Sequence, residues 1–395
     1  MNPFQARMQA VTPTLAVLMV FTLIAPIALM NVVSFLAVLA YFLSGHYREK
    51  WASIKTHPLT YPALFLFGLF MLGVLYSSSD IAYALHHLGK YRELLLLPIA
   101  ISMFSRAEVR QRAYYAFLLA IGVAVLVSFS MRLGWLPVYE NAGEEFAPFR
   151  GRISFGFYLA FAIYLMLHHA LLAEGMRKRL LWSGCAALSA FDLLFLISGR
   201  TGHFVLVALI GLLLIQQRAR VKKYWLVILL VLGALTSAVV LTSPAIKSRS
   251  GDIDKAMSKP EESSIGVRLI FWQTSLRIVA DHPLLGAGTG SFAAESAKHA
   301  GDHPGLVMDN PHNEYLSIAG QLGLVGLLGF IWLLYSQWKI AEQLPPLYGV
   351  AAQGLVVAFA VGCLFNSFLR DEGHFFAIYA GVLFSAFVPS NRATT

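Results

Sequence analysis

Apolar runs of about the length that crosses a bilayer recur along the whole of this chain. A transmembrane helix needs roughly 20 predominantly apolar residues. Apolar residues make up 57% of the 395 residues, and charged residues only 13%, about half of the roughly 25% found in a soluble domain. These runs predict an all-α polytopic membrane protein with about twelve spans, at 13–29, 31–44, 59–76, 91–104, 110–134, 153–173, 180–198, 202–216, 223–242, 315–338, 347–369 and 373–389.

The basic excess of the chain follows the loops between these runs. The formal net charge is +9, which taken alone is compatible with nucleic-acid binding. Lys and Arg accumulate in alternate short loops, however, whereas most acids lie in the loops between them. Because short cytoplasmic loops collect Lys and Arg, we interpret the charge as a topology signal and expect no nucleic-acid partner. Both termini and Arg106, Arg177 and Arg220 are expected in the cytoplasm, with Ser263 and Gly301 on the opposite side. The first apolar run is interpreted as a span and not as a removed signal peptide.

One long polar interval interrupts the apolar chain. It divides the sequence into N-terminal spans (1–242), a loop subdomain (243–314) and C-terminal spans (315–395). Within the loop, the run RLIFWQTSLRIVA, which Arg268 opens, predicts an amphipathic helix. The glycines of GAGTGSF (286, 288 and 290) predict a turn and are a weak signal for phosphate binding. A second short helix, at the membrane surface, is expected around residues 83–92.

Two arginines on the non-cytoplasmic side are candidate anion ligands, because ionisable groups at membrane depth or at helix ends are costly. Arg200 lies in the turn LISGRTGHF, beside Ser198 and Thr201. It either reaches lipid headgroups or binds a phosphate at a helix N-terminus, and the small flanking residues favour the second interpretation. Arg268 belongs either to a helix lying on the membrane, with Trp272, Leu276 and Val279 on its apolar face, or to a diphosphate site that its planar guanidinium would grip.

His312 is the candidate base. It lies in DNPHNEYLSIAG at the entrance to the tenth apolar run, where Asn310 is a candidate helix cap and Pro311 suits the first turn. A histidine here either packs at the helix start or, as a neutral imidazole, takes a proton from an alcohol. No HExxH, CxxC, GxSxG or P-loop motif occurs, and Asp252 and Asp254 are interpreted as solvated, so neither a metal nor a cofactor is expected. The two cysteines, Cys185 and Cys363, lie in apolar runs and imply no disulfide framework.

The combination of HPLLGAGTGSF, then NPHNEYLSIAGQLGLVGLLGF, preceded by Arg268 and by SGRTG, resembles the O-antigen ligase/polymerase superfamily, and most of all bacterial O-antigen ligase. The resemblance covers about residues 195–335. It implies a GT-C-like glycosyltransferase of the bacterial inner membrane that transfers a glycan from undecaprenyl diphosphate to the lipid A–core oligosaccharide at the periplasmic face. The superfamily's essential histidine corresponds to His312, and its two essential arginines to Arg200 and Arg268. An acidic residue near the C-terminal spans corresponds to Asp371 or Glu372.

The expected site therefore has His312 as base and the two arginines around a departing diphosphate, in an inverting, metal-independent displacement. Asn310, Asn313 and Asp371 are expected at the substrate. An O-antigen polymerase or a protein O-oligosaccharyltransferase shares this core and donor, so both stay open as alternatives. A transporter is the third alternative, disfavoured because no repeat is visible and the polar candidates gather at one face instead of the bilayer midplane.

Overall fold

The computed structural model describes residues 2–138, 146–197, 199–221, 258, 260–299 and 306–388. Within these ranges every regular element is a helix, and no β-strand occurs. Among the described helices, six are long and apolar enough to cross a membrane: α1 with η1 (Pro3–Ile24), α7 (Ala107–Arg132), α8 (Arg152–Leu172), α9 with η3 (Met176–Leu196), α17 (Glu314–Ala341) and α18 (Pro346–Phe365). Shorter apolar helices accompany them: α4 (Thr60–Val74), α10 (Arg200–Gln216) and α20 (Gly373–Phe384). The chain is an all-α polytopic membrane protein.

The predicted apolar runs correspond to helices wherever the structure describes them. The run at 223–242 lies outside the described residues, so the total of about twelve spans stays a prediction. The start predicted for the first span, residue 13, was wrong. The helix α1 begins at Pro3, because Asn2 and Gln5 form a capping box around its first turn. The next helix, α2 (Ile27–Leu43), starts directly after Pro26 and is bent by 115° from the short α3 (Tyr47–Thr56).

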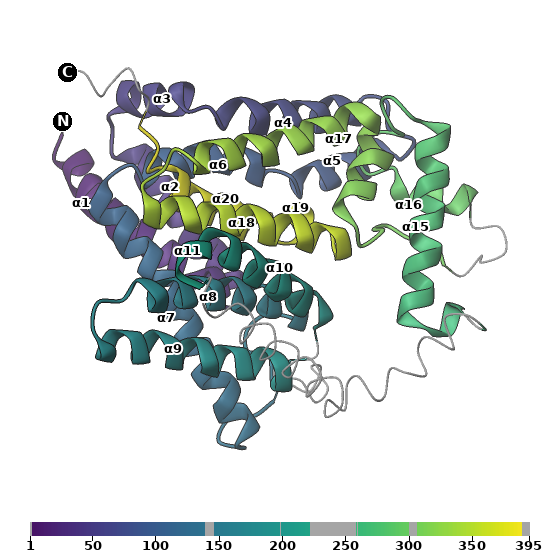
Figure 1. Ribbon diagram of the computed structural model, residues 1–395. Coiled ribbons are helices and arrows are strands. Elements are labelled where there is room, and N and C mark those ends of the chain that lie inside the picture. The colour runs from purple at the N-terminus through teal and green to yellow at the C-terminus, as the bar shows by residue number, and fades with distance from the viewer. Residues whose placement is uncertain are drawn as a thin grey trace.

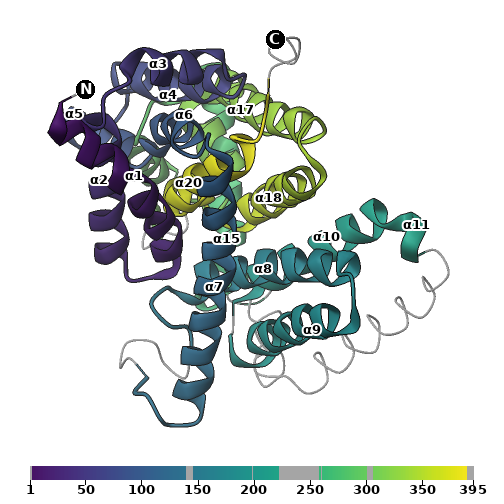
Figure 2. The same cartoon turned by 90° about the vertical axis from the view of Figure 1, so that its left-hand side faces the viewer.

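Most of the long helices run side by side. Figure 1 shows α4, α17, α18 and α20 in one group, with α8, α9 and α10 below them. Figure 2 shows the same division from another side, with α6 (Glu93–Met103) beside α20. The two groups join where α18 packs on α10 and α8. Buried aromatic rings fill the junction, including those of Tyr158, Phe161, Phe375 and Tyr379.

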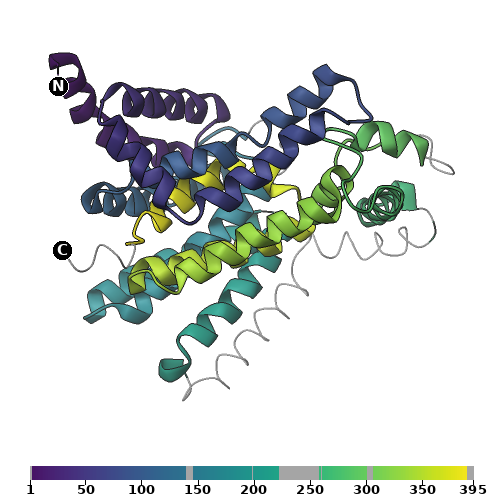
Figure 3. The same cartoon turned by 90° about the horizontal axis from the view of Figure 1, so that it is seen from above.

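The polar loop folds at one end of this bundle. There lie α5 (Ile81–Gly89), α15 (Ser264–Asp281) and α16 (Phe292–Lys298), remote from α3 and from the start of α1 (Figure 1). In Figure 3 α15 is seen nearly end-on while α17 and α18 extend along the page, so α15 lies across the bundle. The expected short helix around residues 83–92 is α5, which begins earlier, after the capping side chain of Asp80.

The loop helix differs from its prediction in two respects. It begins at Ser264, capped by the side chain of Ser263, so Arg268 lies in its second turn and does not open it. Its apolar face is also different: Leu276 is 57% exposed, whereas Ile278 is buried. Together with Ala287, Phe292 and Met308, and with Phe271 against them, Ile278 forms a second, small hydrophobic core. The helix is therefore anchored to the loop subdomain and does not merely lie on a membrane surface.

The glycine-rich turn is a docking element for α17 and not a phosphate loop. The helix is broken at Gly323, whose φ is 62°. The break frees the carbonyls of Gly320 and Gln321, which accept hydrogen bonds from the amides of Ala287 and Gly288, both at 2.9 Å. On the other side of the turn, the amide of Thr289 donates to the carbonyl of Gly73 at 3.0 Å. Since these amides are bound within the protein, they are not available to cradle a phosphate.

Candidate active site

His312 lies on a short irregular segment just before α17. The helix begins at Glu314, and its N-cap is Asn313, whose side chain accepts from the amide of Leu316 at 3.1 Å. The expectation that Pro311 opens the helix with Asn310 as its cap is therefore wrong. Asn310 instead makes a local turn: its side-chain oxygen accepts from the amide of His312 at 3.0 Å. The backbone of His312 is left-handed, with φ of 51°, which is uncommon for a residue other than glycine.

A cavity of about 250 Å³ opens beside this histidine. It joins three parts of the chain, the start of α8, the His312 segment and the turn before α20. Its lining consists of Gly151, Arg152, Ile153, Ser154, His312, Asn366, Phe368, Asp371 and Glu372. The cavity therefore places an imidazole, a guanidinium and two carboxyl groups around one space.

Two helix N-termini, each with an arginine as its first residue, lie side by side at this end. Arg152 begins α8 and Arg200 begins α10. Their close approach depends on glycine, because a Cβ added at Gly199 would lie 2.6 Å from the carbonyl oxygen of Arg152, and one at Gly202 would lie 2.6 Å from that of Gly156. Helix N-termini carry partial positive charge. These two helix ends and their guanidinium groups together therefore favour the binding of an anion.

Arg268 on α15 completes the cationic cluster. Burial lowers the pKa of Arg268, and the charges of Arg200 and Arg152 lower it further, so both of these guanidinium groups are close enough to act on Arg268. We call Arg152, Arg200 and Arg268 the arginine cluster. A multiply charged anion such as a diphosphate would reduce the repulsion between these like charges.

The loop helix also brings the arginine cluster to His312. Trp272, one turn beyond Arg268 and so on the same face, donates from its indole nitrogen to the carbonyl of Pro311 at 3.2 Å. The ring of Phe271 faces that of His312, with centroids 6.4 Å apart. Burial and the charges of Arg268 and Arg370 lower the pKa of His312, against the opposing effect of Asp309. The imidazole is therefore neutral at neutral pH and able to accept a proton.

The other residues expected at the substrate have different positions. Asn310 and Asn313 are each 7% exposed, and Asn313 also donates to the carbonyl of Leu364 at 3.1 Å. The two asparagines thus hold the His312 segment, and their contact with the substrate stays a prediction. Asp371 lines the cavity with a half-exposed carboxyl group, and burial raises its pKa. Glu372 is buried and accepts from the hydroxyls of Ser154 and Tyr158, so of the two acids Asp371 is the one open to a ligand.

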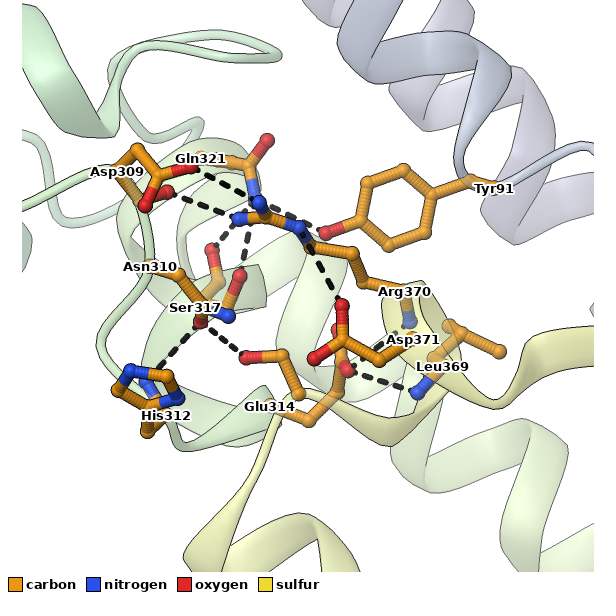
Figure 4. Close-up of polar contacts among 11 residues, drawn as sticks. Tyr91, Asp309, Asn310, His312, Glu314, Ser317, Gln321, Leu369, Arg370 and Asp371 are labelled. Carbon is orange, nitrogen blue, oxygen red and sulfur yellow. Dashed lines mark hydrogen bonds and ion pairs between the residues drawn. The ribbon is translucent and has the colours of Figure 1, made fainter. Parts of the chain in front are cut away.

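Three residues at this end were missed in the sequence. Arg152 carries the same signal as Arg200, an arginine at the start of an apolar run. Arg370 carries another, a basic residue in a loop predicted to lie outside, against the usual charge bias. Figure 4 shows Arg370 reaching from α19 (Phe368–Asp371) toward Asp309. Glu314 gave no signal, since a carboxylate at a helix start is common, yet it is fully buried.

Four of the residues considered earlier lie outside the described parts of the chain: Ser198, Asp252, Asp254 and Gly301. Within the described parts, no group of three His, Cys, Asp or Glu side chains has an arrangement that suits a metal ion.

Residues 185–331 match the model of a protein family described as O-Antigen ligase. This match supports membership of the O-antigen ligase/polymerase superfamily. The matched region runs from α9 into α17 and includes Arg200, Arg268 and His312, whereas Arg152 and Arg370 lie outside it. No curated protein matches the chain closely enough to count as a relative. The same match indicates a glycosyltransferase-like membrane enzyme of the ligase/polymerase type.

Proposed function

We propose that this protein is an O-antigen ligase. It transfers a polysaccharide from undecaprenyl diphosphate to the lipid A–core oligosaccharide at the periplasmic face of the inner membrane. The observation that carries the proposal is the cavity that His312 shares with Arg152, whose charge, with that of Arg200, acts on Arg268. A base beside an anion site is what glycosyl transfer from a diphosphate needs, because the leaving group is already good and departs as an anion.

The reaction is a single displacement. A hydroxyl oxygen of the acceptor sugar attacks the anomeric carbon, while the bond from that carbon to the diphosphate oxygen breaks and the diphosphate leaves with the electron pair. The hydroxyl proton passes to the neutral ring of His312. Arg152, Arg200 and Arg268 stabilise the negative charge that develops on the leaving group. One displacement inverts the anomeric centre, and the guanidinium groups take the charge-neutralising role, so transfer is expected to persist in excess chelator.

The histidine assignment is tested by His312→Ala in purified protein reconstituted with lipid-linked glycan and lipid A–core. We expect the transfer rate to fall by roughly 10²- to 10⁴-fold, the range for loss of a general base, with donor binding retained. His46→Ala is the matched control, since His46 also has a positive φ, 56°, but lies next to α3. A parental rate for His312→Ala would contradict the proposed function.

The choice of ligase over polymerase is tested by lipopolysaccharide profiles of a strain that lacks the gene. Loss of a ligase leaves lipid A–core without polymer, while long lipid-linked chains accumulate. Loss of a polymerase instead leaves core that carries a single repeat unit. That profile would refute the ligase assignment but would not affect the assignment of His312 as base.

A further inference from the structure

The backbone around His312 is held in an uncommon conformation by another part of the chain. Its left-handed φ of 51° persists in a residue with a side chain only where surrounding contacts determine it. Those contacts come from residues 364–371, the end of α18 and the short α19, which we call the C-terminal platform. This segment is adjacent to His312 in space but about fifty residues away in sequence.

The first contact fixes the turn itself. The side-chain oxygen of Asn310 accepts two hydrogen bonds, from the amide of His312 at 3.0 Å and from the hydroxyl of Ser367 at 2.5 Å. Ser367 is fully buried and Asn310 nearly so. Both donors meet at the side-chain oxygen of Asn310. The hydroxyl of Ser367 therefore orients the side chain of Asn310, which in turn holds the backbone of His312.

The other contacts hold the segment on both sides of His312. Before it, the guanidinium of Arg370 donates to the carboxylate of Asp309 at 2.9 Å and to the carbonyl of Asp309 at 3.0 Å. After it, the buried carboxylate of Glu314 accepts from the amide of Leu369 at 2.8 Å and from that of Arg370 at 3.3 Å. Figure 4 shows these groups converging from the two segments. The segment that carries His312 is therefore attached to the platform at each end.

We propose that the C-terminal platform aims the imidazole of His312 at the acceptor hydroxyl, with Ser367 and Arg370 as positioning residues that do not touch the substrate. This inference rests on the proposed role of His312 as base. A base must lie within hydrogen-bond reach of the proton that it takes, and small displacements lower the rate strongly. Loosening the platform should thus slow the transfer step. Binding of the donor to the arginine cluster should be unchanged.

Arg370 has a second effect that a purely structural contact would not have. The charged groups that face His312 are Arg268 on α15, Arg152 on α8, Arg370, Asp371 and Glu372 from the turn before α20, and Asp309 from its own segment. Of these, Arg268 and Arg370 lower the pKa of His312 by their positive charges, and Arg370 is the one that belongs to the platform. Replacing it with a neutral side chain should raise that pKa and shift the acidic limb of the rate profile to higher pH. Replacing it with lysine should keep the limb near its parental position.

The test compares Ser367→Ala, Arg370→Gln and Arg370→Lys in reconstituted transfer across the pH range in which histidine titrates. Ser367→Ala should lower kcat roughly fivefold or more, the equivalent of one hydrogen bond, with the KM for donor and the pH profile unchanged. Arg370→Gln should lower kcat and shift the acidic limb upward, whereas Arg370→Lys should lower kcat without that shift. Ser385→Ala is the control, because the hydroxyl of Ser385 bonds only within its own turn, to the carbonyl of Val382.

Each variant is first checked for parental thermal unfolding, and Ser367→Ala removes too little to prevent folding. Parental kcat for both Ser367→Ala and Arg370→Gln would overturn the inference, as would an unmoved acidic limb in Arg370→Gln. If His312→Ala is inactive while the platform variants are normal, only the positioning role fails. If His312→Ala is active, the proposed function fails as well.

Discussion

At the scale of single residues, His312 depends on groups that are distant in the chain. Arg268 precedes it by more than forty residues and Arg370 follows it by more than fifty, yet both cations act on its ring and keep it neutral. Asp309 opposes them and is itself bound by Arg370. The imidazole is therefore set up as a proton acceptor by the balance of these charges and by burial.

The lowered pKa of His312 predicts a specific pH profile. A histidine base works in its neutral form, so activity is full above its pKa and is lost as the pH falls through it. Because the pKa in the folded protein is below the ordinary 6.5, the acidic limb of kcat should have its midpoint below that value. Transfer rates measured across acidic buffers check this. A midpoint above the ordinary value would mean that another group limits the rate.

Arg152 should contribute to donor binding although it lies outside the matched family region. Removing one charge-assisted contact costs about 1.5–3 kcal/mol, so Arg152→Ala is expected to weaken donor binding and kcat/KM by roughly 10- to 100-fold. Arg152→Lys should recover part of the loss, because an ammonium keeps the charge but lacks the planar fork. Arg177→Ala is a matched control in the exposed first turn of α9. Equal activities for Arg152→Ala and this control would remove Arg152 from the arginine cluster.

At the scale of elements, the broken helix α17 joins the loop subdomain to the bundle. Past the break, the amides of Leu324 and Val325 donate to the carbonyls of Pro283 and Leu284, at 2.9 and 3.2 Å. Together with the bonds from Ala287 and Gly288 to the carbonyls freed by the break, they replace helical bonds with bonds to the glycine-rich turn. Inside a bilayer, backbone groups that leave a helix must find partners in the protein, and this turn supplies them.

Gly288→Ala tests the docking of the glycine-rich turn on α17. Its φ is 95°, and an added Cβ would lie 2.3 Å from the Cα of Ser77, so we expect a loss of stability of more than about 2 kcal/mol from backbone strain and the clash. Gly211→Ala is the control, because Gly211 lies in α10 with nothing within 4 Å of the added atom, and alanine favours a helix by about 0.5–1 kcal/mol. Thermal unfolding in detergent measures both. Equal melting temperatures would contradict the docking role of the turn.

At the scale of the whole molecule, the site lies at one end of the bundle. The arginine cluster, His312 and the platform gather where α8, α10 and α17 begin and α18 ends, on the side that also carries α15 (Figure 1). A lipid-linked donor keeps its diphosphate at the membrane surface, so this end is where such a substrate would meet the chain. The direction in which the bundle crosses the membrane is a prediction from the loop charges.

Single-cysteine labelling tests that direction. In a chain without Cys185 and Cys363, Gln273→Cys on the exposed face of α15 should react with an impermeant thiol reagent from the periplasm. Lys178→Cys, in the exposed basic first turn of α9, should react only after the inner membrane is breached. The reverse pattern would place the candidate site in the cytoplasm and would be incompatible with the proposed donor.

The sequence alone predicted most of the described apolar helices and named several candidate site residues. Helix formation rests on contacts within a few residues and on local hydrophobicity, so the apolar runs appear as helices where they were predicted. Arg200, Arg268 and His312 became candidates because each breaks a local pattern or belongs to a recognisable motif. Only the tertiary structure brought Arg152 beside Arg200, assigned the amides of the glycine-rich turn to α17, and placed Ser367 and Arg370 against the segment of His312. These pairings join residues far apart in the chain, and they follow from how whole helices pack, which no local pattern encodes.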